Sequence, residues 1–412
     1  MKNFALALLL IYLSIHAQPG RSQTTKSADS LFTLARTAAF TSKDFQSAIL
    51  LAKRSLIAQE NTEVRVFLGR LYTWNNEADS ARLELNQVLR KDPRNLEALA
   101  ARFDVELWQG LPDSALHYAE TGLSFYPESG EFVTRKMKAL VALKKVSSAL
   151  KAGNTFLQTH PVDSAVLRTK KELKDTNPLN SVGINHTLVK FDKRFDKPWN
   201  LTSLTYGRRT DFGSLHLNLN HANRFSQGGF EGELESYVNI AKGLYSYLGG
   251  GFSGSEIFPE YRLGFSLYKS LPLSFEAEGG IRYLKFAEGT TVFVVGLGKY
   301  LGSGFYSVRT FITPSSGAAP TISTTITARY FTGEDRYDSF GLSLGTGTSP
   351  DDRARDILIS NNLQSIKIGA DYSVNIFKRT TLGFVASWAR EEYLTDTFGN
   401  QFTIGASLSQ RF

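Results

Sequence analysis

A stretch of the chain from Phe258 to Phe286 alternates apolar and polar residues with a period of two. The apolar positions of its first half are Tyr261, Leu263, Phe265 and Leu267. After an expected turn at Ser270–Pro272 the alternation resumes, with an apolar face that begins at Leu273. Because successive side chains of a strand point to opposite faces, the pattern predicts a two-faced β-hairpin. Its strands have roughly ten residues or more, which exceeds the usual strand of soluble proteins and is typical of a transmembrane β-barrel.

The same period continues to the end of the chain. Strands are expected near 182–192, 199–210, 214–225, 229–240, 244–254, 260–269, 273–286, 291–300, 305–313, 321–331, 338–347, 362–377, 381–392 and 401–412. About 14 strands is an even number, as in single-chain bacterial barrels. The predicted fold is therefore multidomain, with an all-α helical solenoid followed by an antiparallel transmembrane β-barrel.

The first residues have the features of a secretory signal peptide. Lys2 precedes an apolar run from Phe4 to Leu13, and the small residue Ala17 is a suitable cleavage site. An uncleaved anchor is the alternative, but the run is too short to span a bilayer. The chain contains no cysteine, which excludes disulfides, thiolate metal sites and a lipoprotein anchor. The net charge of +8 is spread along the chain, unlike the clustered basic stripe of a nucleic-acid-binding protein.

Residues 24–176 are expected to be helical and repetitive. Two sets of residues recur at intervals of 34, namely Pro93, Pro127 and Pro161, and Ala81, Ala115 and Ala149. This period resembles that of the tetratricopeptide repeat (TPR). About four repeats and a capping helix near 164–174 are expected, then a linker at 177–181 and the barrel at 182–412. Such arrays bind partners on a concave face, although a spacer or barrel support is an alternative.

The best-formed repeat begins near Thr62. The small Gly69 and Ala81 are expected to let its two helices approach closely, with Tyr72 filling the space beside them. Pro93 should end the second helix because proline lacks an N–H and clashes with the preceding turn. Later repeats are degenerate, since Phe103 and Met137 replace the glycine, and Glu106 and Leu140 replace the tyrosine.

Turn lengths predict how the barrel lies in the membrane. In outer-membrane barrels short turns face the periplasm and long loops face outward. The longest expected loop, Ser349 to Asn361, would therefore face outward, and the helices would lie in the periplasm. The short connection from Phe225 to Gly229 does not fit this scheme. The terminal Phe412, which follows alternating apolar residues, resembles the C-terminal signal that the barrel-assembly machinery reads. Gln410 departs from this signal, which usually has an aromatic residue at that position.

Several motifs together resemble the YaiO-type family of outer-membrane β-barrels, which often carry TPR repeats. They are Phe258–Arg262, Leu271–Pro272, Glu276–Phe286, Arg329–Phe331, Gly341–Gly345 and Ser349–Pro350. The resemblance covers roughly residues 180 to 412. It implies an outer-membrane location and a barrel fold, and an association with exopolysaccharide production or export. It offers no catalytic residues.

The polar face of the strands should line the barrel lumen. Its charged residues are Glu231, Glu233, Glu235, Arg262, Glu276, Glu278, Arg282, Arg309, Arg329, Lys367 and Asp371. They could form ion pairs that fill a small barrel, or a lining that guides a polar solute or glycan. Paired acids could also suggest glycoside hydrolysis and His216 a serine hydrolase, but no motif supports either enzyme. The residues Tyr261, Tyr283, Tyr330, Tyr372 and Trp388 should face outward as interfacial girdles.

Three hypotheses of function follow. The first is an outer-membrane barrel with a periplasmic TPR domain that supports glycan secretion as a pore or a scaffold. The second is a passive structural or small-solute barrel whose repeats recruit envelope partners, and the third, more distant, is an outer-membrane enzyme. Expected partners are outer-membrane lipid, the barrel-assembly machinery and a periplasmic protein bound by the TPR domain, and the first hypothesis adds a polysaccharide. No cofactor, metal or nucleic acid is expected, because no ligand spacing or phosphate-binding loop occurs.

Overall fold

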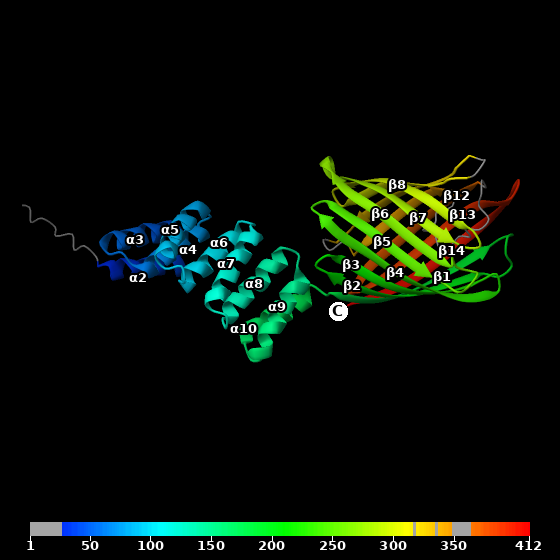
Figure 1. Ribbon diagram of the computed structural model, residues 1–412. Coiled ribbons are helices and arrows are strands. Elements are labelled where there is room, and N and C mark those ends of the chain that lie inside the picture. Colours follow the sequence, from blue (N-terminus) through cyan, green and yellow to red (C-terminus); the bar gives the residue numbers. More distant parts are fainter. Residues whose placement is uncertain (1–26, 316–318, 334–336, 348–363) are drawn as a thin grey trace, which may run out of the picture. The chain divides into compact units, whose positions relative to one another are not determined.

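The computed structural model describes residues 27–315, 319–333, 337–347 and 364–412 (Figure 1). The predicted leader, residues 1–17, and the predicted loop from Ser349 to Asn361 lie outside these residues. By its internal contacts the chain divides into two compact units between Leu143 and Lys144. The predicted domain limits, with helices up to residue 176 and a barrel from residue 182, stay predictions.

Helices form the first unit and the start of the second. Those of the first unit are α2 (Ala28–Phe40), α3 (Phe45–Ala58), α4 (Thr62–Trp74), α5 (Ala78–Lys91), α6 (Leu96–Trp108), α7 (Pro112–Phe125) and α8 (Gly130–Ala142). The second unit begins with α9 (Val146–Thr159) and α10 (Ser164–Thr176). Within the part of the chain that the structure describes, no helix is both long and apolar enough to span a membrane.

The interval of 34 residues recurs at the ends of α5, α7 and α9 and at the starts of α4, α6, α8 and α10. Helices α5, α7 and α9 each end two residues before one of the recurring prolines. Polar caps recur at the same interval, because the side chains of Asn61, Asn95, Ser129 and Asp163 each accept a backbone N–H of the following first turn. Such caps satisfy N–H groups that have no partner within the helix.

Close packing joins the two helices of the repeat that begins at Thr62. A Cβ atom added to Gly69 would lie 2.6 Å from Cγ of Leu85, so only glycine lets α4 approach α5 this closely. Ala81 is fully buried beside it, and Tyr72 is buried in the same cluster. The corresponding Ala115 and Ala149 are fully buried too.

A buried carboxylate replaces the tyrosine in the next repeat. Glu106 on α6 accepts two hydrogen bonds of 3.0 Å from Arg82 on α5 and one of 2.6 Å from Arg102. Burial alone would raise the pKa of Glu106, but the hydrogen bonds from the two arginines outweigh it and lower the pKa. The guanidinium of Arg102 also lies 4.6 Å from the ring centre of Tyr118 on α7. Ion pairs thus join α5 to α6, and a cation–π contact joins α6 to α7.

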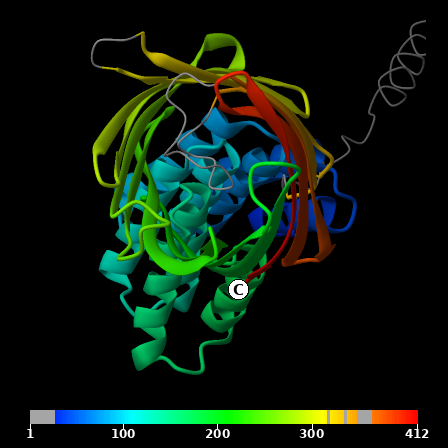
Figure 2. The same cartoon turned by 90° about the vertical axis from the view of Figure 1, so that its right-hand side faces the viewer.

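The rest of the second unit is a closed antiparallel barrel, as the alternating pattern predicts (Figure 2). Each strand pairs with the next along the chain, and β14 pairs with β1. The strands are β1 (Asn180–Phe191), β2 (Trp199–Thr210), β3 (Gly213–Arg224), β4 (Gln227–Ala241), β5 (Leu244–Phe252), β6 (Tyr261–Leu271), β7 (Phe275–Lys285), β8 (Gly289–Leu301), β9 (Gly304–Thr313), β10 (Thr321–Phe331), β11 (Ser339–Thr346), β12 (Ser365–Phe377), β13 (Thr380–Leu394) and β14 (Thr397–Arg411).

Burial along the strands follows the predicted faces. On β6, Leu263 and Phe265 are exposed on the outer face. Ser266, which points to the inner face of the same strand, is buried. Four of the outward aromatic residues are exposed as expected, namely Tyr261, Tyr283, Tyr330 and Tyr372. Trp388 is half-buried on the outer face and donates a hydrogen bond of 3.1 Å to Asn400.

The predicted turn between β6 and β7 is wrong by about two residues. Ser270 and Leu271 still belong to β6, and the connection is a short 3-10 turn, Pro272–Ser274. Leu273 and Ser274 have φ of 59° and 61°, in the left-handed region. Leu273 therefore does not begin the apolar face of β7, since this backbone turns the chain instead of extending it.

The barrel has two ends, which we call the linker end and the distal end. The linker end is where β1 begins and β14 ends, and there Asn180 and Phe412 exchange backbone hydrogen bonds of 2.9 and 2.8 Å. The distal end holds tight turns, including the two-residue turn Phe225–Ser226 with φ of 55° and 64°. The orientation predicted from turn length stays a prediction.

Two turns at the linker end contact the helices of the second unit. Asp211, between β2 and β3, accepts backbone N–H groups of Ser147 and Ser148 over 2.9 and 3.0 Å, together with the hydroxyl of Ser148. Arg379, between β12 and β13, donates to the carbonyls of Lys174 and Asp175 over 3.3 and 3.0 Å. Asp211 thus caps the start of α9, and Arg379 contacts the end of α10.

Candidate functional site: the charged wall of the lumen

Three acids on β4 point into the barrel at alternate positions. Glu231 is fully buried, and its carboxylate accepts hydrogen bonds from Asn220 over 3.1 Å and from Arg262 over 3.3 Å. Glu233, also buried, lies 3.5 Å from the same amide nitrogen of Asn220. The strand alternation places these carboxylates inside, and β3 and β6 supply their partners.

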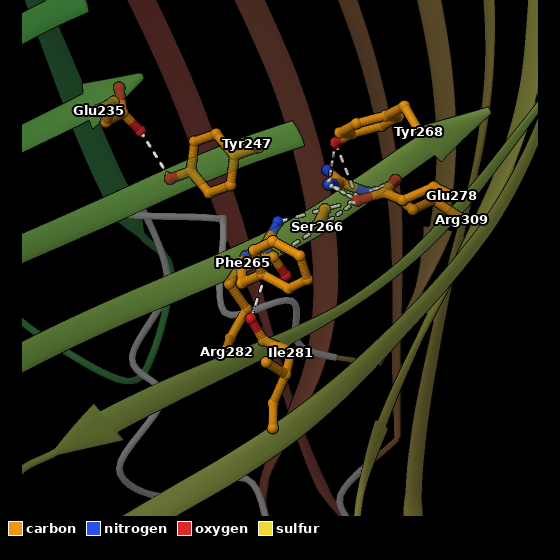
Figure 3. Close-up of polar contacts among 9 residues, drawn as sticks. All are labelled: Glu235, Tyr247, Phe265, Ser266, Tyr268, Glu278, Ile281, Arg282 and Arg309. Carbon is orange, nitrogen blue, oxygen red and sulfur yellow. Dashed lines mark hydrogen bonds and ion pairs between the residues drawn. The ribbon is translucent and has the colours of Figure 1, made fainter. Parts of the chain in front are cut away.

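The third acid belongs to a neighbouring set of contacts. Glu235 accepts a hydrogen bond from Asn218 over 3.0 Å. It also accepts one from the hydroxyl of Tyr247 over 2.9 Å, which Figure 3 shows. Asn218 in turn accepts from Thr205 over 2.8 Å. The polar atoms of β2, β3, β4 and β5 are therefore joined across the inner surface.

A second carboxylate centre lies on β7. Glu278 receives two hydrogen bonds from Arg309, of 2.8 and 2.6 Å, and one each from Ser266 and Tyr268, of 2.8 and 2.9 Å (Figure 3). Arg309 comes from β9, two strands away, so the pair spans the intervening β8. Bidentate arginine–carboxylate pairs are among the stronger and more directional polar contacts.

Arg282 joins the two groups of acids. It lies 3.9 Å from Glu278, and its guanidinium donates to Ser266 and to the carbonyls of Phe265 and Ile281 over 3.0, 3.0 and 3.1 Å (Figure 3). The same guanidinium lies 4.9 Å from the ring centre of Tyr247. We call the connected set the charged wall; its members are Glu231, Glu233, Glu235, Arg262, Glu278, Arg282 and Arg309.

The charged wall borders a small internal cavity of about 190 Å³. Tyrosines complete the lining, in particular Tyr237, Tyr247 and Tyr268. Sequence reasoning did not single out these inward tyrosines. Their positions have the same parity as Glu235 on β4 and as Arg262 on β6, so the period of two contained the signal.

Two predicted lumen residues lie apart from the main contacts. Glu276 faces inward toward the linker end, within hydrogen-bonding reach of Tyr245. Arg329 on β10 pairs with Asp371 on β12 over 2.9 Å, on the opposite part of the strand order. The structure therefore does not bring Arg329 together with Glu231, Glu233 and Glu235.

The connection between β5 and β6 enters the distal mouth. Ile257 and Phe258 are buried there against inward residues of β2 and β3, Leu201 and Ala222. The hydroxyl of Ser253 fastens the start of this connection by donating to the carbonyl of Phe230 over 2.6 Å. An apolar plug therefore covers part of the mouth beside β2 and β3.

The remaining candidate positions are His216, possible metal-ligand groups and Phe412. His216 lies 3.3 Å from Ser214 on its own strand. Among the residues that the structure describes, no group of three or more His, Asp or Glu side chains is placed to hold a metal ion. Phe412 closes the seam through its backbone, and its role as an insertion signal stays a prediction.

Comparison with known families agrees with this architecture. Residues 179–352 match the YaiO membrane beta barrel domain, and residues 39–102 match the tetratricopeptide repeat. The barrel is similar to this family's domain from β1 to β11. TPR repeats precede it, so both parts of the family resemblance are confirmed. The family match ends before β12, whereas the barrel continues to β14.

Solved structures resemble each part separately. A tetratricopeptide repeat protein from Parabacteroides merdae has 16% identity and a TM-score of 0.33, over 40% of this chain and 62% of that one. The chain thus spans about three fifths of that relative. The CymD monoaromatic hydrocarbon channel has 8% identity and a TM-score of 0.36, over 58% of this chain and 90% of that one.

The outer membrane protein Omp33 of Acinetobacter baumannii has 10% identity and a TM-score of 0.36, over 57% of this chain and 98% of that one. A search of curated proteins found no match.

Proposed function

We propose that this outer-membrane barrel supports secretion of a polysaccharide, and that its lumen is the path. The observation that carries the proposal is a closed barrel with a polar interior, joined to TPR repeats at one end. A polar lumen suits a hydroxyl-rich polymer, and helical repeats suit a protein partner on the synthesis side. We further propose that the leader directs export, that the repeats lie in the periplasm and that the protein is not an enzyme.

A groove in the first unit supports the assignment of a protein partner. It has a volume of about 720 Å³ and lies along α2, α4 and the start of α6. Four aromatic residues in mutual contact form its apolar part, Phe32, Phe40, Phe67 and Trp74. Arg36, Glu63, Arg70 and Glu97 surround them. Aromatic anchors with a charged rim are typical of protein-binding surfaces.

The test is secretion by the host. A strain without the protein should release less polysaccharide, and the native chain should restore the release. Unchanged release of polysaccharide by the deletion strain would refute the proposal.

A second function, a passive barrel that holds envelope partners in place, is favoured by the paired charges of the lumen. Glu231 forms an ion pair with Arg262, and Glu278 forms one with Arg309. The paired side chains of the charged wall occupy space and thus narrow the interior of the barrel. Planar-bilayer recordings separate the two functions. A protein that restores secretion but passes neither ions nor sugars would be a scaffold, not a pore.

A further inference from the structure

Lysines and exposed leucines gather at the linker end of the barrel, on the sector from β4 to β9. In the strand order this sector lies across from the seam, away from the two turns that contact α9 and α10. Its linker-end turns join β4 to β5, β6 to β7 and β8 to β9. Six residues in or beside these turns form what we call the basic rim: Lys242, Lys269, Leu271, Leu273, Lys299 and Leu301.

The leucines of the basic rim extend the apolar outer face of the barrel. Leu271 follows the exposed Leu267 on the outer face of β6. Leu273 is 81% exposed, and its φ of 59° is a left-handed backbone that disfavours a bulky side chain and is usually adopted by glycine. Leu301, at the end of β8, is 66% exposed. The rim is therefore continuous with the face that lipid covers in a membrane barrel.

The lysines of the basic rim carry charge that no acid neutralises. On the outer face, Lys269 comes two residues after Leu267, and Lys299 comes two residues after the exposed Leu297. The ammonium group of Lys299 lies 4.3 Å from the ring centre of Phe275. Within the part of the chain that the structure describes, the three lysines form no ion pair. Long lysine side chains of this kind can follow an apolar surface with their stems and place the charge among polar headgroups.

The distal end of the same sector has the opposite charge. The exposed acids of its two connections are Glu256, Glu260 and Glu288. One lysine lies beside them, Lys285, whose ammonium group donates to the carbonyl of Ala287 over 2.9 Å. The apolar residues Ile257 and Phe258 of the β5–β6 connection are buried, unlike the leucines of the basic rim. The sector is thus basic at the linker end and acidic at the distal end.

We propose that the basic rim binds the headgroups of anionic phospholipids in the leaflet at the linker end. Its continuity with the outer face makes lipid the occupant, because a lipid whose acyl chains cover Leu267 and Leu297 has its headgroup near the rim. The charge selects the kind of lipid, since each lysine close to an anionic membrane surface raises binding roughly fivefold. The exposed leucines enter the boundary between headgroups and acyl chains, as in interfacial amphipathic segments. This inference does not depend on the proposed secretion function.

The experiment measures lipid association by electron spin resonance, in phosphatidylcholine bilayers that contain the full-length protein. Spin-labelled phosphatidylglycerol, which is anionic, is compared with spin-labelled phosphatidylcholine, which has no net charge. The native protein should associate preferentially with the phosphatidylglycerol label. Sodium chloride at about 1 M should remove most of this preference, because it shortens the screening length to about 3 Å.

Variants locate the preference on the barrel. The triple variant Lys242→Gln, Lys269→Gln and Lys299→Gln should lose most of it. The matched control changes three lysines of the distal end, Lys190→Gln, Lys197→Gln and Lys285→Gln, and should keep the native preference although its net charge falls by the same amount. Arginine at the three rim positions keeps the charge and should keep the preference too.

Two results would overturn the proposal. A native protein without a preference for phosphatidylglycerol, or with one that salt does not weaken, would leave the basic rim as a surface for a protein partner. An equal loss of preference in the rim variant and the distal control would show that net charge alone sets the selectivity. The salt comparison uses the native chain, so it decides the matter even if the triple variant does not fold.

Discussion

Removing the carboxylate of Asp211 should loosen helix α9 from the linker end of the barrel. Asp211 accepts two backbone N–H groups and one hydroxyl at the start of α9. Loss of a capping side chain costs about 0.5–2 kcal/mol. Loss of a negative charge at a helix N-terminus adds about 0.3–1 kcal/mol. One to two kcal/mol changes an equilibrium constant by a factor of about 5 to 30, so Asp211→Ala should lower the equilibrium constant for docking by that factor and reduce the docked fraction accordingly.

Pulsed electron double resonance between spin labels at Lys151 and Lys242 measures this fraction. Both residues are exposed, and the absence of native cysteine allows labelling at these two positions alone. The native protein should give one narrow distance distribution, and Asp211→Ala should add a broad component. Asp211→Asn should have a smaller effect, because the amide keeps one acceptor oxygen but loses the charge.

Asp196→Ala is the control, since Asp196 is an exposed acid of the connection between β1 and β2 at the distal end. Arg379→Ala alone should do less than Asp211→Ala, because exposed ion pairs contribute about 0–1 kcal/mol. The double variant should broaden the distribution further. An unchanged narrow distribution in the double variant would refute the assignment of these two contacts as the attachment.

Three further changes test other parts of the molecule. Phe265→Arg, on the outer face near the middle of β6, should destabilise the barrel by about 2–4 kcal/mol in urea unfolding with lipid present. The control Phe265→Leu should not destabilise it. Equal stability of the arginine variant and the native protein would argue against lipid contact at this position. Gly69→Trp should lower the melting temperature of the helices, because overpacking against Leu85 costs about 1–3 kcal/mol of stability. The control Leu83→Trp changes an exposed residue and should leave the melting temperature unchanged. The same melting temperature in Gly69→Trp and the native protein would contradict the close α4–α5 contact. The pKa of Glu106 is lowered in the folded state, so its contribution to stability is complete above the unfolded pKa and disappears as the pH falls through the folded pKa. Glu106→Gln should therefore weaken the loss of helical stability below about pH 5, and the same pH dependence in both proteins would exclude Glu106 as its source.

The sequence predicted the strands closely because the period of two is visible in every one of them. The bounds of β2 and β10 coincide with the expectation, and β3 differs by one residue at each end. The turn at Pro272–Ser274 was placed too early, because nothing in the residue types of Leu273 and Ser274 requires a left-handed backbone. The interval of 34 residues located the helices, but the recurring polar caps became evident only from their hydrogen bonds.

For the lumen, the period of two indicated which residues face inward but not which of them meet. Glu231 contacts Arg262 and Glu278 contacts Arg309, in both cases two strands away. Such pairs depend on strand register and on the stagger of the closed barrel, and side chains of intervening strands determine whether they can reach each other. The tyrosine partners of the acids, among them Tyr247, depend on the same register.

The seam between Asn180 and Phe412 has a consequence for the order in which the molecule forms. It pairs residues at opposite ends of the barrel sequence, so β1 has an unpaired edge until the last strand arrives. Contacts between such distant residues form slowly, since the intervening chain must first be ordered. Asn180 also follows α10 closely. Closure of the seam is therefore a late event that fixes, in one step, both the circumference of the barrel and the point at which the helices leave it.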